Sequence, residues 1–190
     1  MVGQCRWINP PAQWTLGPHS LAIVTDPETD FWRDARHEFT KHSGHLFAYD
    51  APAKFTAAVR VRAGFETQYD QAGLMVLVDE AHWAKAGIEM SGGEALLSTV
   101  VTIGRSDWAL APFRGNSSDF WMRLMVNRGV LRVETSSDGQ RWSLARLSAF
   151  PQIDRYLVGP MCCSPKREGM RAVFSDFSLA GASQQLIAAG

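Results

Sequence analysis

The stretch that decides the fold is AGLMVLVDEAHWAKAGIEM, residues 72–90. Its first part, residues 72–79, is almost wholly apolar, which is typical of a central strand covered on both faces. In the second part, small and apolar side chains alternate with Lys85, Gly87 and Glu89. Successive side chains of a strand point to opposite faces, so Lys85 and Glu89 share an open face, about 13 Å apart. A glycine between them indicates the close approach of another group, and we expect it to form a floor on which a ligand or a neighbouring side chain rests.

The remainder of the chain also has the pattern of short strands separated by turns. Residues 119–127, for example, alternate between two sets of side chains with a period of two, as half-buried strands do. Asp138 and Gly139 separate two such runs, which predicts a β-hairpin because both turn residues need positive φ. Many short strands at close spacing indicate an all-β domain, either a sandwich or a closed barrel. We expect one domain over residues 1–181 and a C-terminal tail over residues 182–190.

Composition excludes several classes of partner. Nineteen basic residues balance nineteen acidic ones, so there is no general attraction to nucleic acid or to anionic membranes. No apolar run approaches the roughly 20 residues of a membrane helix, and the first residues lack a secretory signal pattern. The three cysteines, two of them adjacent, lack metal-binding spacing. We therefore expect a reduced, cytoplasmic protein without metal or cofactor, in which His37, His42 and His45 are surface or loop residues.

Alternation in the other strands extends the predicted open face. It places Trp121 and Arg123 on the open side of one strand and Glu134 on that of the next, whereas residues 106–108 are expected in a loop at the rim. Carboxylates, cations and tryptophans on one face are typical of a carbohydrate groove. The alternative is a set of solvated cross-strand charge pairs, each contributing little. The predicted ligand-binding residues are Tyr69, Gln71, Lys85, Glu89, Trp108, Trp121, Arg123 and Glu134.

Several ordered motifs between Trp14 and Leu179 resemble one family. They are VDEAHW, KAGIE, a Ser-x-Val-Val-Thr strand, SDW, FWMRLMVNRG, SSDGQRW, VGPMCCSP and FSDF. Together they resemble DUF1349, a family also described as regulation-of-enolase-like. The resemblance implies the fold of the concanavalin A-like lectins and glucanases, which is a jelly-roll sandwich of two antiparallel sheets, one of them concave. The activity of the family is largely unassigned, although some fungal members are described as regulators of enolase.

These observations leave three functions open. The first is a non-catalytic domain that binds a carbohydrate or a similar polar ligand in the concave groove. The second is a glycan-active enzyme, glucanase-like or lyase-like, that uses the same groove with Glu89 at its centre. The third is a protein-interaction role as a regulator of a metabolic enzyme, which only the family description suggests.

Two comparisons bear on the enzyme hypothesis. Retaining glucanases of this fold class need two carboxyl groups about 5–5.5 Å apart, and the strand of Glu89 has no such partner. Lyases of the alginate-lyase type carry Lys-Ala-Gly-x-Tyr on a groove strand, and KAGIE matches it only as far as Gly87, with Glu89 in place of the tyrosine. We therefore assign no catalytic residue from the sequence.

Overall fold

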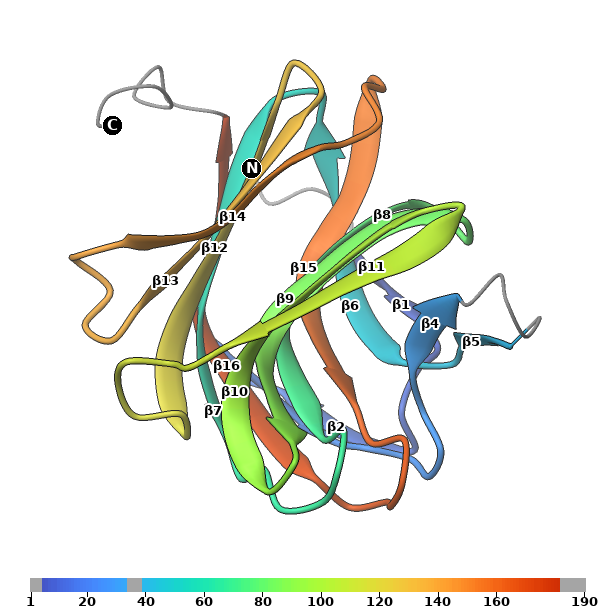
Figure 1. Cartoon of the computed structure of the whole chain (residues 1–190), viewed down its shortest axis with the longest axis vertical. Coiled ribbons are helices and arrows are strands. Elements are labelled where there is room, and N and C mark those ends of the chain that lie inside the picture. Colours follow the sequence, from blue (N-terminus) through green and yellow to red (C-terminus); the bar gives the residue numbers. More distant parts are fainter. Residues whose placement is uncertain (1–4, 34–38, 182–190) are drawn as a thin grey trace.

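The computed structural model describes residues 5–33 and 39–181, and every regular element in these ranges is a β-strand (Figure 1). Two large antiparallel sheets pack face to face, which confirms the predicted sandwich, and a small hairpin lies beside them. No helix long and apolar enough to cross a membrane occurs among these residues.

The two sheets contain seven strands each. In spatial order, sheet A consists of β1 (Cys5–Ile8), β6 (His45–Pro52), β15 (Arg155–Cys163), β8 (Gln71–Asp79), β9 (His82–Ser91), β10 (Glu94–Ile103) and β11 (Arg105–Ala111). Sheet B consists of β14 (Ser143–Ala149), β13 (Val130–Ser136), β12 (Asp119–Asn127), β7 (Phe55–Ala63), β16 (Arg171–Gly181), β3 (Ser20–Val24) and β2 (Gln13–Leu16). Strands β4 (Phe31–Arg33) and β5 (Thr40–His42) form the separate hairpin.

The main core lies between the two sheets and follows the alternation predicted from the sequence. Ala84, Ala86 and Ile88 of β9 are buried in it, together with alternate apolar residues of β7, β8 and β12. Strands β13 and β14 form the predicted hairpin, but residues 137–142 connect them, and of the pair Asp138 and Gly139 only Gly139 has a positive φ, of +74°. Residues 106–108, predicted in a rim loop, differ from the prediction. They form part of edge strand β11 instead.

A second apolar cluster covers much of the outer face of sheet A, the face turned away from sheet B. Phe31 of β4 is fully buried there against Met75, Trp83 and Cys163. Adjacent Cys162 and Cys163 point to opposite faces of β15, and both are free thiols. Cys162 is buried in the main core, and Cys163 is buried in the second cluster because β4 covers it. The segment that carries Phe31 therefore turns an otherwise exposed sheet face into a second small core.

A buried ion pair attaches the same segment to sheet A. Lys85 Nζ donates a hydrogen bond of 2.7 Å to Oδ1 of Asp30, the residue immediately before β4. The Lys85 side chain is only 4% exposed, and that of Asp30 is 18% exposed. Lys85 therefore faces away from the main core, as predicted, but it is enclosed rather than solvated.

Gly87 allows strands β8 and β9 to approach closely. It lies directly opposite Gly73 of β8, and a Cβ atom added at Gly87 would stand 2.0 Å from the carbonyl oxygen of Ala72 and 2.9 Å from the Cα atom of Gly73. The group that approaches Gly87 is thus the backbone of β8, a packing role, and not a ligand or a side chain.

We expect Gly87→Ala to destabilise the protein by about 3 kcal/mol or more, because the clash is with backbone that cannot rotate away. Urea unfolding measures the change. Gly64→Ala is the matched control, since its added Cβ atom would meet only a side-chain oxygen at 3.9 Å. Equal stability of the two variants would contradict this account of the glycine.

We expect Lys85→Met to lower the free energy of unfolding by about 3 kcal/mol or more, because it leaves Asp30 partly buried without its cation. Lys54→Met removes the same charge from an exposed turn and should change stability by less than about 0.5 kcal/mol. A loss for Lys85→Met no larger than that of the control would show that the ion pair does not hold the segment.

Candidate functional site

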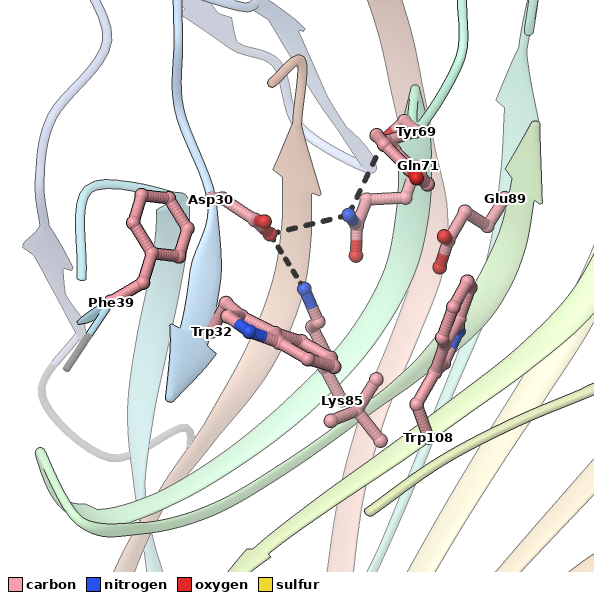
Figure 2. Close-up of a pocket in the computed structure, with 9 residues that line it drawn as sticks. Asp30, Trp32, Phe39, Tyr69, Gln71, Lys85, Glu89 and Trp108 are labelled. Carbon is pink, nitrogen blue, oxygen red and sulfur yellow. Dashed lines mark hydrogen bonds and ion pairs between the residues drawn. The ribbon is translucent and has the colours of Figure 1, made fainter. Parts of the chain in front are cut away.

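A pocket of about 240 Å³ opens on the outer face of sheet A, between the β4 segment and strands β9 to β11 (Figure 2). Its lining combines charged or amide side chains with aromatic ones. The lining residues are Asp30, Trp32, Phe39, Tyr69, Gln71, Lys85, Glu89, Val100 and Trp108.

One side of the pocket is a hydrogen-bonded cluster around Asp30. Its Oδ1 atom accepts hydrogen bonds from Lys85 Nζ (2.7 Å), from Gln71 Nε2 (3.3 Å) and from the backbone N–H of Phe31 (2.8 Å). Burial alone would lower the pKa of Lys85, but the negative charge of Asp30 and its hydrogen bond contribute to raising that pKa above its usual value. Asp30 therefore favours the charged form of Lys85 and balances its charge.

The other side of the pocket holds Glu89, which is only 3% exposed. Its Oε2 atom accepts a hydrogen bond of 2.6 Å from the Ser98 hydroxyl, which in turn accepts one of 3.2 Å from Trp108 Nε1. Burial raises the pKa of Glu89 above its usual value of 4.5, although the bond from Ser98 and the charge of Lys85 oppose the rise. Glu89 is thus held in place by one oxygen and is harder to ionise than an exposed glutamate.

Aromatic rings form the walls. The rings of Trp32 and Trp108 stand at 86° to one another with centroids 6.1 Å apart, and those of Tyr69 and Trp108 at 70° with centroids 6.4 Å apart. Tyr69 has a φ of +70°, a left-handed conformation unusual for a residue with a side chain. Its backbone N–H donates a 2.7 Å bond to the carbonyl of Met90. The backbone at the start of β8 is therefore held in a conformation that presents the tyrosine to the pocket.

The structure brings five of the predicted residues together in this pocket. They are Tyr69, Gln71, Lys85, Glu89 and Trp108. It adds residues that sequence reasoning missed, chiefly Asp30, Trp32 and Phe39. The one signal that could have found Asp30 is Lys85 itself, because a lysine in a run of buried residues requires a nearby carboxylate. Whether these residues bind a ligand stays a prediction.

The expected convergence of Trp121, Arg123 and Glu134 with Glu89 is wrong. These residues lie on β12 and β13 of sheet B, on the face away from the main core. Alternation fixes the face of a strand but not the sheet to which the strand belongs. The alternative of cross-strand charge pairs holds in part, because Arg123 pairs with Glu134 across β12 and β13, but Glu134 is buried rather than solvated. Glu134 accepts bonds from Arg123 Nε (2.6 Å) and Arg132 Nε (2.8 Å), and Arg123 lies over the ring of Trp142 at 4.1 Å.

Metal ligation finds no support in the part of the chain that the structure describes. Among residues 5–33 and 39–181, no group of three or more His, Cys, Asp or Glu side chains is arranged to hold a metal ion. The expectation that His45 is a surface or loop residue is wrong. His45 is buried at the start of β6, where its Nε2 accepts a bond from the backbone N–H of Asp26 and its Nδ1 lies 2.8 Å from the carbonyl oxygen of Asn9. His37 lies outside the described residues.

Known structures share this architecture at low sequence identity. The chain aligns with the GH43 protein BlXynB from Bacillus licheniformis at a TM-score of 0.71 and 13% identity, covering 93% of this chain but only 36% of that one. It aligns with the alginate lyase from Klebsiella pneumoniae at a TM-score of 0.55 and 10% identity, covering 90% and 85%. At these identities the likeness shows the fold alone, and it agrees with the predicted jelly-roll sandwich.

Similarity in sequence extends along the whole sandwich. The family model described as "Protein of unknown function (DUF1349)" matches residues 7–182. Regulation of enolase protein 1 of Saccharomyces cerevisiae is 48% identical over 178 residues, which are 94% of this chain and 90% of that protein. A crystal structure of a functionally unknown protein from Saccharomyces cerevisiae superposes with a TM-score of 0.93 at 47% identity, covering 95% and 97%. The chain therefore belongs to the DUF1349 family.

Proposed function

We propose that this protein binds a small polar ligand of the carbohydrate kind in the pocket on the outer face of sheet A, without converting it. The observation that carries the proposal is the combination of aromatic walls with a buried polar floor in one pocket. The C–H faces of a sugar ring pack against aromatic rings, whereas its hydroxyl groups need hydrogen-bonding partners. Lys85, Gln71 and Glu89 supply such partners at the base of the pocket.

The size of the pocket limits the ligand. Its volume of about 240 Å³ lies below the roughly 300–1,000 Å³ of pockets for drug-sized ligands. This favours a single sugar ring, or the end of a chain, over a long stretch of polysaccharide.

An enzyme that acts on a glycan in the same pocket is the second candidate, because the raised pKa of Glu89 suits a proton donor or acceptor. A hydrolase with two carboxyl groups would need a second one free to act. Asp30 is the other carboxylate in the pocket, and its Oδ1 atom already accepts three hydrogen bonds. This favours binding over catalysis, and product analysis after long incubation with oligosaccharides separates the two.

A role toward a protein partner is the third candidate. The yeast relative is named Regulation of enolase protein 1, and that name favours a contact with a metabolic enzyme. The three free cysteines are typical of a protein of the reducing cytoplasm, where a metabolic enzyme would be available as a partner. Co-purification of the pocket variants described below with their partners tests whether the pocket takes part.

We expect Trp108→Ala to weaken sugar binding at least tenfold, because it removes a pocket wall and the hydrogen bond to Ser98. Isothermal titration calorimetry measures the affinity. Trp14→Ala is the matched control, since Trp14 is exposed to a similar extent (44% against 40%) but lies on β2 of sheet B. Equal affinities of the two variants for the sugar that the parent protein binds would contradict the assignment of the pocket.

We expect Glu89→Gln to be more stable than the parent protein at about pH 8, with the difference shrinking toward about pH 4. A carboxyl group whose pKa is raised by folding contributes stability while it is protonated. That contribution is complete below its unfolded pKa and is lost as the pH rises through its folded pKa. Urea unfolding across this pH range measures the effect. Glu80→Gln, in the exposed turn between β8 and β9, should show no such trend, and an equally flat profile for Glu89→Gln would contradict the buried, hard-to-ionise state of Glu89.

A further inference from the structure

We infer that the ligand of this pocket carries a positive charge, so that an amino sugar fits it better than a neutral or an acidic sugar does. The inference rests on the proposed function and names the class of ligand more narrowly. Three observations carry it. They are the balance of charges in the pocket, the free oxygen of Glu89 and the arrangement of the aromatic walls.

Within residues 5–33 and 39–181, the charged side chains that line the pocket do not balance. They are Asp30, Lys85 and Glu89. Lys85 and Asp30 neutralise one another at 2.7 Å, and Asp30 receives two further hydrogen bonds from Gln71 and from the backbone of Phe31. Among the lining residues that the structure describes, the carboxyl group left over is that of Glu89, so these three groups, when all are ionised, carry one negative charge in excess.

Glu89 is also incompletely bonded. Ser98 donates to its Oε2 atom, but Oε1 has no hydrogen-bond partner within residues 5–33 and 39–181. The side chain is 97% enclosed, and in Figure 2 its carboxyl group points toward the space between Gln71 and Trp108. A carboxyl oxygen that none of these residues satisfies can still accept a hydrogen bond, and a ligand ammonium placed in the pocket would supply the donor.

The aromatic walls of the pocket also favour a positively charged ligand. Trp108 stands nearly perpendicular to both Trp32 and Tyr69, at 86° and 70°, so that ring faces and edges enclose the pocket from different sides. The face of an aromatic ring attracts a cation, most strongly where water is excluded. A ligand carboxylate would bind less well. Glu89 would repel it, and Lys85 would attract it only weakly because Asp30 already balances the lysine charge.

The test is calorimetric titration with four probes of similar size: D-glucosamine, D-glucose, D-glucuronate and cyclohexylamine. At about pH 6.5 a sugar amine largely carries its proton. We expect D-glucosamine to bind the parent protein about tenfold more tightly than D-glucose, the margin of a charge-assisted over a neutral hydrogen bond. We expect D-glucuronate to bind more weakly than D-glucose.

Two further measurements separate a charge preference from a loss of structure. Glu89→Gln should abolish the preference for D-glucosamine over D-glucose, whereas Glu80→Gln should retain it. In the parent protein the affinity for D-glucosamine should fall as the pH drops through the raised pKa of Glu89, because protons then compete with the ammonium group. The affinity of Glu89→Gln should lack that dependence.

Each outcome decides something. Binding of D-glucose or D-glucuronate as tight as that of D-glucosamine would overturn the inference and leave sugar binding standing. Binding of cyclohexylamine as tight as that of D-glucosamine, without binding of D-glucose, would support the charge preference and overturn the sugar part of the proposed function. Failure of all four probes to bind would overturn both.

Discussion

The ion pair between Lys85 Nζ and Asp30 Oδ1 determines what the outer face of sheet A becomes. Lysine in the middle of a sheet needs a carboxylate once it is enclosed, and Asp30 supplies it from a segment 55 residues earlier in the chain. That contact places Phe31 over Met75, Trp83 and Cys163, and so builds a second apolar cluster outside the main core. The same ion pair marks the boundary of the cluster, because Asp30 and Lys85 both line the pocket beside it.

The pocket follows from that arrangement. Covering part of the sheet face encloses Glu89, and the cation that lines the pocket among the described residues, Lys85, is already paired with Asp30. Burial then raises the pKa of Glu89, and the bond chain from Trp108 through Ser98 to Glu89 fixes its position. An apolar residue at this position would serve stability as well, which is why we propose a ligand for the pocket that Glu89 and Trp108 line. Glycines 73 and 87 contribute only indirectly, by allowing β8 and β9 to approach closely beneath the pocket.

Local alternation predicted much of this architecture, and its failures have a common cause. The pattern of β9 correctly placed Ala84 and Ile88 in the core and Glu89 on the opposite face. The same reasoning gave the correct face for Arg123, but the strand pairing that assigns β12 to sheet B involves residues far apart in sequence. Asp30 was missed for the same reason, because its partner lies on a distant strand. Alternation describes one strand, whereas the site is made by contacts between strands and an irregular segment.

The most direct test of the central claim is a ¹³C NMR titration of the Glu89 side-chain carboxyl, identified by its absence from the spectrum of Glu89→Gln. The claim is that Glu89 is an enclosed, uncompensated carboxyl group that faces a site for a cationic ligand. It predicts a titration midpoint above 4.5 in the free protein and a fall of that midpoint when D-glucosamine saturates the pocket. A midpoint at or below the usual value, or one that D-glucosamine leaves unchanged, would contradict it.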